Sequence, residues 1–273
     1  MDSSRVSGWD QRPVIDTSVA HTARVWNYWL GGKDNYPVDQ EVGDQVHAVI
    51  PGVVDTARAE RGFLVRAVRY LAGEAGIRQF LDIGTGLPTV NNTHEVAQAT
   101  APECRIVYVD NDPLVLVHAR ALLTSTPEGV TDYIDADLCD HTTILREAAR
   151  TLDFTRPIAL MLLGIINHIM DTDEAYAIVD RLLDALPTGS YLALTHPATE
   201  VDSDGVLKAM RLWNESGATP RMVARSRPEL LRFFERLELL KPGVVSSSLW
   251  RPDPIDIGTP VEVYGFSGVG RKP

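Results

Sequence analysis

The sequence of 273 residues is poor in cysteine and has only two, Cys104 and Cys139. They lie far apart, and neither belongs to a C-x-x-C pair or to a cluster with histidine. A disulfide framework needs several cysteines, and a structural zinc site needs Cys or His ligands grouped at short spacing. The sequence therefore predicts two reduced thiols and no metal site.

Long apolar runs are lacking as well. The N-terminal residues show no basic segment followed by an apolar one, which a secretory signal would have. No run approaches the roughly 18 apolar residues that are needed to span a bilayer. We therefore expect a soluble, cytoplasmic protein that does not contact a membrane.

Positive charge is scarce relative to negative charge. The chain has 37 acidic and 26 basic residues, which gives a formal net charge of -11. A negative field of this kind repels phosphate backbones and anionic membrane surfaces. The arginine-containing stretch 221–236 is the one candidate for a local basic patch, but an exposed helix face explains it better. We expect a small-molecule substrate and no nucleic acid as partner, with a homodimer as an open possibility for the assembly.

The N-terminal part of the chain differs from the rest. Residues 1–16 are polar and predict a flexible arm. Helical patterns follow at 17–30 and 53–76, and the sequence therefore predicts an N-terminal helical cap over residues 17–75 and a core over 76–273. The second helical pattern has apolar residues on one side and these arginines largely on the other: Arg58, Arg61, Arg66 and Arg69.

Short apolar runs alternate with helical segments after this part. Such alternation predicts an α/β fold, because parallel strands need crossover helices and are buried on both faces. A further helix is predicted at 227–236. The expected strands are 79–83, 105–110, 132–135, 158–163, 190–195, 238–240 and 261–266. Glycine-containing segments at 258–260 and 268–270 are interpreted as breaks on either side of the last strand.

The first predicted strand ends in a glycine turn that points to a nucleotide-like ligand. Gly84 and Gly86, with Thr85 between them, let the backbone turn tightly and a ligand approach closely. A dinucleotide fingerprint needs a third glycine where this chain has Thr89. The carboxylate of Asp82 beside the turn would repel a pyrophosphate and attract an ammonium or sulfonium centre. The turn therefore favours a cationic nucleoside ligand over NAD.

Acidic residues follow the next two strands at the same predicted edge. Asp110 ends the second strand near the spacing at which a carboxylate accepts hydrogen bonds from ribose hydroxyls, and Asn111 adjoins it. Asp112 precedes a proline and is better explained as a helix N-cap. Asp137, next to Leu138, suits the exocyclic amine of an adenine ring. A solvated loop acid explains Asp137 equally well.

Two histidines follow the fourth and fifth strands. His168 and His196 are the candidate catalytic residues, because an imidazole at either position could orient a substrate or accept a proton. A structural role remains the alternative for both. Methyl transfer from a sulfonium makes modest demands on acid and base groups, since alignment supplies much of the acceleration.

Aromatic residues are concentrated in 26–36, which contains two tryptophans and two tyrosines. Composition leaves two interpretations open, the packing of an N-terminal helix and an aromatic lid over a ligand. The motif Trp-Asn-Tyr-Trp-Leu-Gly-Gly-Lys-Asp-Asn-Tyr in this segment is far more specific than a G-x-G turn. Together with blocks at 80–88, 107–113 and 187–196, it resembles the S-adenosyl methyltransferase family of actinobacteria, formerly listed as a domain of unknown function.

The resemblance implies a Rossmann-like class I methyltransferase fold, with a mostly parallel seven-stranded sheet, helices on both faces and an N-terminal helical cap. It implies S-adenosylmethionine as cofactor, with Gly84, Gly86, Asp110 and Asp137 at positions that match the family's cofactor cleft. The resemblance also implies that three residues close over this cleft, namely Tyr28, Gly31 and Asn35. The chain departs from the commoner Ala-Val-Leu-His-His pattern at 164–168 and from Ala-Asn-Arg-Ala at 59–62.

Three functions are therefore considered. The leading one is an S-adenosylmethionine-dependent methyltransferase that acts on a small molecule of unidentified structure. A non-catalytic module that binds the same cofactor is the second, because no unambiguous catalytic base is present. An NAD(P)-dependent oxidoreductase of Rossmann fold is the third, and Thr89 argues against it.

Overall fold

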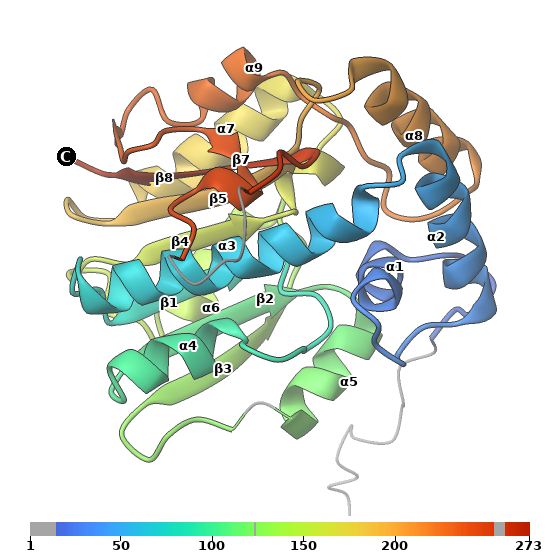
Figure 1. Cartoon of the computed structure of the whole chain (residues 1–273). Coiled ribbons are helices and arrows are strands. Elements are labelled where there is room, and N and C mark those ends of the chain that lie inside the picture. Colours follow the sequence, from blue (N-terminus) through green and yellow to red (C-terminus); the bar gives the residue numbers. More distant parts are fainter. Residues whose placement is uncertain (1–14, 123, 254–259) are drawn as a thin grey trace, which may run out of the picture.

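The computed structural model describes residues 15–122, 124–253 and 260–273, so most of the predicted arm lies outside the described residues. A central sheet forms the middle of the molecule, with helices on both of its faces (Figure 1). Its strands are β1 (Gln79–Ile83), β2 (Arg105–Asp110), β3 (Val130–Asp135), β4 (Ala159–Leu163), β5 (Tyr191–Pro197), β6 (Glu238–Leu239), β7 (Val245–Ser246) and β8 (Gly265–Arg271).

The strands follow the order β3-β2-β1-β4-β5-β8-β6, and β7 pairs with β8 beside this path. The first five strands are parallel, and β8 runs antiparallel to β5. The expected seven strands make up the path, and the two-residue β7 is an addition. Every residue of β1 is buried, including the polar residues Gln79 and Asp82, as expected of a central strand that is covered on both faces. The predicted Rossmann-like arrangement is confirmed.

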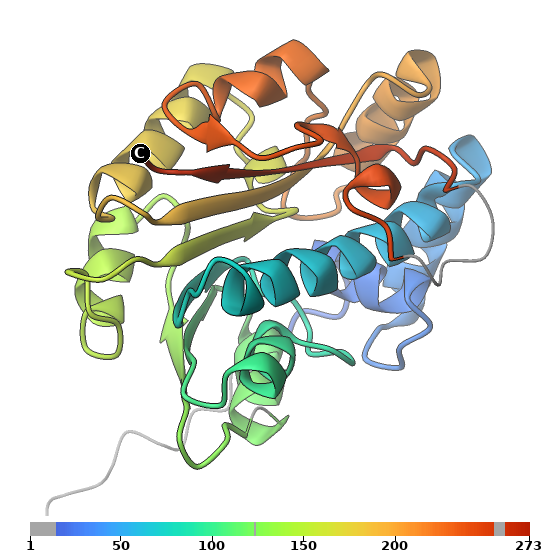
Figure 2. The same cartoon turned by 60° about the vertical axis from the view of Figure 1, so that its left-hand side comes forward.

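Two sets of helices cover the sheet (Figures 1 and 2). On one face α3 and α4 bury their apolar sides against the strands, and on the other α6, α7 and α9 do so. The helices of the described chain are α1 (Thr22–Trp29), α2 (Pro37–Val49), α3 (Val53–Gly73), α4 (Thr93–Thr100), α5 (Pro113–Leu122), α6 (His141–Ala148), α7 (Thr172–Asp184), α8 (Ser203–Glu215) and α9 (Arg227–Arg232), with short 3-10 turns η1 (Ile166–His168) and η2 (Ser247–Leu249).

Helices α1, α2 and α8 pack together at one end of the molecule (Figure 1). Their buried cluster includes Trp29 of α1, Val46 of α2 and Trp213 of α8. Helix α1 begins later than predicted because the residues before it pair with the segment after α8. The Thr219 N–H donates to the Ala20 carbonyl, and the Thr22 N–H donates to that of Thr219.

The last strand was predicted wrongly at 261–266, since β8 spans Gly265–Arg271. Gly268 and Gly270, which the sequence analysis placed in a break, lie inside the strand. A Cβ at either position would come within about 3 Å of the Phe234 ring. These glycines therefore make room for a bulky neighbour on the face of the sheet. The segment 258–259 of the other expected break lies outside the described residues.

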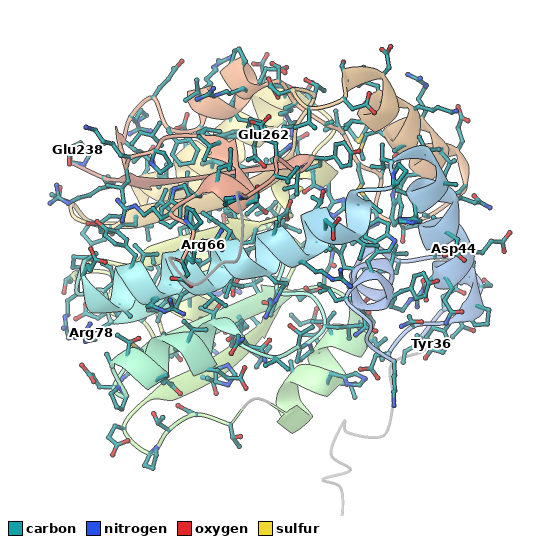
Figure 3. The ribbon with its side chains drawn as sticks, in the orientation of Figure 1. Tyr36, Asp44, Arg66, Arg78, Glu238 and Glu262 are labelled. Atoms are coloured by element: carbon teal, nitrogen blue, oxygen red, sulfur yellow. The ribbon has the colours of Figure 1, made fainter. Side chains whose placement is uncertain are left out.

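Arg61 and Arg66 of α3 are half-buried, although the sequence places them on the polar side of this helix. Figure 3 labels Arg66 on α3, near the C-terminal segments. Its guanidinium donates to the carbonyls of Trp250 (2.9 Å) and Ser247 (2.7 Å). Covering segments from late in the chain thus bury part of the helix face that periodicity assigned to water.

No helix of the described residues is long and apolar enough to cross a membrane. Cys104 is buried and Cys139 is exposed, and both are unpaired thiols.

Candidate functional site

A cleft opens at the carboxyl edge of the parallel strands, where their connecting loops meet. It consists of two adjoining cavities of about 160 Å³ and about 190 Å³. The residues that line both cavities are Gly84, Asp110, Asn111, Ile165, His168 and Pro220. Five of these six residues follow the ends of β1, β2 and β4, so the strand order itself assembles the cleft.

The glycine turn forms one wall of the first cavity. Gly84 and Gly86 have φ angles of 77° and 66°, values that L-residues with side chains rarely adopt. A Cβ on Gly84 would lie 2.6 Å from the Ile165 side chain, whereas one on Gly86 would meet nothing within 4 Å. Thr85 also lines this cavity. The turn is therefore tight on its inner side and open toward the cleft at Gly86.

The carboxylate of Asp110 organises this turn. Its Oδ2 accepts the Gly86 N–H and its Oδ1 accepts the Asp112 N–H, both at 2.9 Å. Burial raises the pKa of Asp110, and the two N–H donors oppose this rise. Each carboxylate oxygen has a further lone pair, so Asp110 can also accept hydroxyl groups of a ligand in the cleft.

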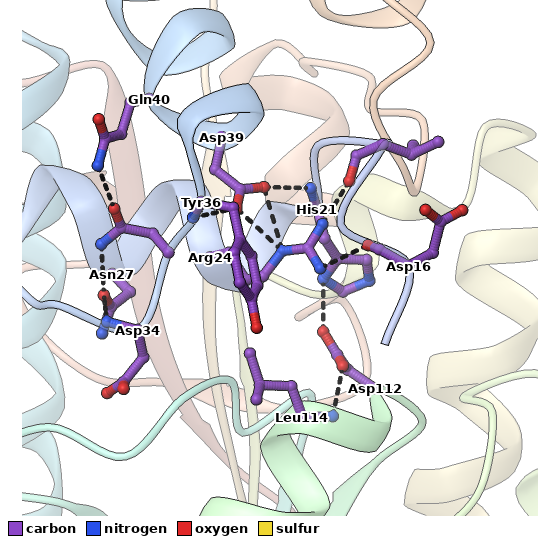
Figure 4. Close-up of polar contacts among 12 residues, drawn as sticks. Asp16, His21, Arg24, Asn27, Asp34, Tyr36, Asp39, Gln40, Asp112 and Leu114 are labelled. Carbon is purple, nitrogen blue, oxygen red and sulfur yellow. Dashed lines mark hydrogen bonds and ion pairs between the residues drawn. The ribbon is translucent and has the colours of Figure 1, made fainter. Parts of the chain in front are cut away.

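The predicted N-cap role of Asp112 is confirmed. Its Oδ1 accepts the Leu114 N–H at 2.8 Å in the first turn of α5. Its Oδ2 lies 2.8 Å from Nδ1 of His21 at the start of α1. Asp112 therefore joins the N-terminal helices to the sheet beside the cleft, as Figure 4 shows.

Asp82 and Arg61 place opposite charges at the far end of the first cavity. Asp82 is 5% exposed, and burial raises its pKa to about 6 although Thr93 and Arg61 oppose the rise. The Thr93 hydroxyl donates to its Oδ2 at 2.6 Å. The Arg61 guanidinium donates to the backbone carbonyls of Val90 and Asn91, both at 3.0 Å. This end suits a ligand that carries both an ammonium and a carboxylate group.

The second cavity brings together the predicted adenine-side residues. Asn111 Nδ2 donates to Asp137 Oδ2 at 3.0 Å, and the other oxygen of Asp137 accepts the Cys139 N–H at 2.8 Å. Leu138 supplies buried apolar surface to the same wall. A flat ring with an exocyclic amine fits between an apolar side chain and a fixed carboxylate.

His168 lines both cavities as a neutral imidazole. Its Nδ1 is 2.9 Å from the Arg221 carbonyl, and a carbonyl only accepts, so Nδ1 carries the hydrogen. Burial lowers the pKa of His168 to about 4. Its Nε2 is therefore unprotonated at neutral pH and is the ring nitrogen that can accept a hydrogen bond.

His196 does not line either cavity of the cleft. Its Nδ1 donates to the Pro197 carbonyl at 2.8 Å, and its Nε2 accepts from Arg225 Nη1 at 2.7 Å. Burial and the Arg225 charge lower its pKa to about 3. Both nitrogens are therefore used in holding the loop after β5 against Arg225.

Helix α1 closes the side of the first cavity opposite the glycine turn. Trp26, Asn27 and Leu30 line it from this helix. The ring of Trp26 also packs edge-on against Trp29, with centroids 5.8 Å apart. Both interpretations of the aromatic segment thus describe part of it, because one tryptophan faces the cleft and the other packs in the cluster.

The three residues implied to close over the cofactor lie just beside the cleft lining. Tyr28 donates its hydroxyl to Asp44 of α2 at 2.8 Å. Asn35 donates to the Asn27 amide oxygen at 2.9 Å, and Gly31 is exposed with a φ angle of 79°. Their contact with a cofactor stays a prediction.

A polar network holds this helical cap in place (Figure 4). The buried Arg24 guanidinium donates from Nε to Asp39 at 3.1 Å and from Nη1 to the Asp16 carbonyl at 2.9 Å. Asp39 also accepts the backbone N–H groups of His21 and Tyr36. Asp39 of α2 therefore ties the start of α1 to the start of α2 and helps to fix how α1 lies beside the cleft.

Glu60 is the functional candidate that the sequence analysis missed. It lies on α3 at the inner end of the first cavity, where the Thr195 hydroxyl donates to its Oε2 at 3.0 Å. Burial raises its pKa to about 7, while the Thr195 hydrogen bond opposes the rise. Glu60 falls on the same helical stripe as Leu64, Ala67 and Leu71. A carboxylate on an apolar stripe is the signal that could have revealed it.

The sequence matches the family described as S-adenosyl methyltransferase over residues 8–273. It is similar to the structure of a DUF574 family protein from Streptomyces avermitilis, with 46% identity, a TM-score of 0.90, and coverage of 95% of this chain and 100% of that chain. The structure of a methyltransferase candidate from Thermobifida fusca has 43% identity and a TM-score of 0.86, and the match covers 97% and 99% of the two chains.

A more distant likeness concerns the fold alone. A SAM-dependent methyltransferase from Anabaena variabilis shares 14% identity and a TM-score of 0.50, over 96% of this chain and 98% of that chain. A comparison with curated proteins found no match.

Proposed function

The chain belongs to the S-adenosyl methyltransferase family, and from this premise we propose that it transfers a methyl group from S-adenosylmethionine to a small-molecule acceptor. The family supplies the cofactor and the reaction class. The observation that carries the residue assignments is the hydrogen bond between Asp110 and the open backbone of Gly86. It places a buried carboxylate beside a turn that a nucleoside can approach closely.

The charges of the cleft fit this cofactor. S-adenosylmethionine carries a sulfonium and an ammonium group, and the carboxylates of Asp82 and Asp110 lie at the first cavity. The single carboxylate of S-adenosylmethionine would pair with the guanidinium of Arg61, which lines the first cavity together with Asp82. Its ribose would lie at Asp110, and its adenine between Leu138 and Asp137. A dinucleotide would instead place its pyrophosphate next to Asp82, where like charges repel.

The bound cofactor supplies an electrophilic methyl group on a positively charged sulfur. The residues of the chain orient it and exclude water. The glycine turn and α1 close opposite sides of the first cavity, and Trp26 adds apolar surface near its centre. The neutral Nε2 of His168 accepts a hydrogen bond from a ligand at the junction of the two cavities. With a pKa of about 4, His168 acts as an orienting group rather than a base at neutral pH.

A calorimetric titration tests the proposal directly. We expect S-adenosylmethionine and S-adenosylhomocysteine to bind, and NADH to give no heat, because Thr89 replaces the third glycine of a dinucleotide turn. Binding of NADH without binding of S-adenosylhomocysteine would instead indicate an oxidoreductase. Transfer of label from methyl-labelled cofactor to small molecules of a cell extract separates an enzyme from a non-catalytic module, which would bind without turnover.

A further inference from the structure

A third cavity adjoins the cleft and is lined by residues of the cap helices and α8. We call it the apolar chamber; it has a volume of about 60 Å³. Trp26, Glu60 and Gly164 line both the apolar chamber and the first cavity of the cleft. The chamber therefore adjoins the end of the cleft at which α3 presents Glu60.

The walls of the apolar chamber are mainly aromatic and aliphatic. Trp29 and Trp213 contribute from α1 and α8, and Met210 and Tyr264 contribute beside them. The indole N–H of Trp213 donates to the Pro220 carbonyl at 2.8 Å, and that of Trp29 also donates to a backbone carbonyl. The tryptophans thus offer their apolar surfaces, which suit the apolar body of a small molecule.

Two polar side chains in this wall point to the kind of group that enters. Glu60 is the one charged residue among the described residues that line the chamber. Asn167 is only 4% exposed, and its Oδ1 has no hydrogen-bond partner within the described residues. A buried acceptor without a donor is costly, so native proteins rarely leave one unmatched. The Glu60 carboxylate and the Asn167 Oδ1 atom are both hydrogen-bond acceptors, so a ligand that binds them must have N–H or O–H donors.

We propose that the apolar chamber is the acceptor site and that the acceptor is a small apolar amine. Its amino group lies between Glu60 and Asn167, and its apolar part packs against the tryptophans. An amine meets these requirements better than an alcohol, because it has more than one hydrogen for two acceptors. The protonated amine carries a positive charge, which is attracted to the negative charge of Glu60 and to the faces of aromatic rings. This inference rests on the proposed function for the identity of the methyl donor.

The position of Glu60 suits proton transfer at the entrance of the chamber. Thr195 fixes one carboxylate oxygen, and a Cβ on Gly265 would lie 2.0 Å from the other, so the glycine makes room for it. The pKa of about 7 lets Glu60 accept a proton near neutral pH. The other titratable groups that line the adjoining cavity are His21, Arg61, Asp82, Tyr108, Asp110 and His168.

The reaction balances with these groups. The ammonium form of the acceptor gives one proton to the Glu60 carboxylate, which leaves a lone pair on nitrogen. That lone pair forms the new N–C bond, and the C–S bond breaks with its electrons remaining on sulfur as a neutral thioether. The methylated product leaves as an ammonium ion, and the protonated Glu60 then releases its proton to solvent, so that one proton is released for each methyl group transferred.

The test is a calorimetric titration of the cofactor-free protein at about pH 8 with three matched probes that are small enough for the chamber: n-propylamine, 1-propanol and propionate. We expect the amine to bind about tenfold more tightly than the alcohol, and propionate to bind least, because of the Glu60 charge. Glu60→Gln should reduce amine affinity about tenfold without changing that for the alcohol. The matched control is Glu74→Gln, which makes the same change at the exposed residue that directly follows α3.

A second variant tests the place of binding. Ala209 is fully buried on α8 and lines the chamber, so Ala209→Leu fills part of the space. We expect it to abolish amine binding while S-adenosylhomocysteine still binds, and circular dichroism checks that the variant is folded. With methyl-labelled cofactor, the amine should yield N-methylpropylamine in the unsubstituted protein.

Equal affinities for the amine and the alcohol would overturn the proposal, as would unchanged amine binding by Glu60→Gln. Loss of S-adenosylhomocysteine binding would contradict the proposed function instead. Because the amine titration contains no cofactor, the two failures are distinguishable.

Discussion

Glu60→Gln is expected to stabilise the folded protein by up to about 3 kcal/mol at about pH 8, because a pKa unit corresponds to about 1.4 kcal/mol. Burial raises the pKa of Glu60 from 4.5 to about 7, so the folded state disfavours the ionised carboxylate. Glutamine is neutral at every pH, has nearly the same shape, and can still accept the Thr195 hydroxyl. The substitution therefore removes an electrostatic cost and keeps the hydrogen bond.

The pH dependence follows from the direction of this shift. The folded pKa of Glu60 lies above the unfolded one, so its favourable contribution is present below about pH 4.5 and is lost as the pH rises through about 7. The variant should match the unsubstituted protein near pH 4 and gain its full advantage by about pH 8. Asp82 and the buried histidines titrate in both proteins, so their effects cancel in the difference.

Denaturant unfolding at several pH values measures this difference. Glu74→Gln, at the exposed residue that directly follows α3, is the control and should leave the stability close to that of the unsubstituted protein. A variant that is less stable than the unsubstituted protein at about pH 8 would mean that Glu60 is compensated by a cation in the folded state. In that event the carboxylate could not serve as the proton acceptor proposed above.

Asp110→Ala is expected to weaken S-adenosylhomocysteine binding by about 1–3 kcal/mol, which is roughly fivefold to 150-fold. The variant removes the carboxylate that would accept the ribose hydroxyls. It also leaves the Gly86 and Asp112 N–H groups without their acceptor, so the glycine turn loses its support. Both effects act on the ligand's most buried part.

Calorimetry gives the affinity, and thermal unfolding without ligand shows how much of the loss comes from the fold. Asp135→Ala is the matched control, because Asp135 pairs with Asp110 across β2 and β3 but is exposed and lines neither cavity. Its affinity should equal that of the unsubstituted protein. If Asp110→Ala bound the ligand equally well, the ribose would have to be placed elsewhere.

The parts of the structure that the sequence predicted well depend on local patterns. Continuous apolar runs gave the five parallel strands to within two residues at each end. The glycine turn after β1 could be located because only glycine readily adopts the positive φ angles found there. Since carboxyl ends of parallel strands share one edge, the positions of Asp82, Asp110 and Asp137 near one cleft followed from their places in the chain.

The strand at the C-terminus was predicted at the wrong residues because its position depends on a tertiary contact and not on a local pattern. Glycine usually interrupts a strand, and nothing in the local sequence reveals that Gly268 and Gly270 face the ring of Phe234. The sequence predicted comparable positions for His168 and His196 after neighbouring strands, whereas in the structure His196 lies inside β5 and His168 lies in η1 after β4. Their surroundings differ because Arg225, which is distant in the sequence, lies beside His196 in the structure.

The sequence by itself determined the layered α/β fold, the edge at which the cofactor cleft forms, and the family, because these follow from periodicity, turn chemistry and a long motif. Tertiary structure decided which side chains meet. Packing of α8 against α1 and α2 created the apolar chamber, and the stripe of α3 that buries its leucines carried Glu60 inward to it. A pattern in the sequence specifies which face of a helix is buried, whereas the neighbours of that face depend on contacts between residues far apart in the chain.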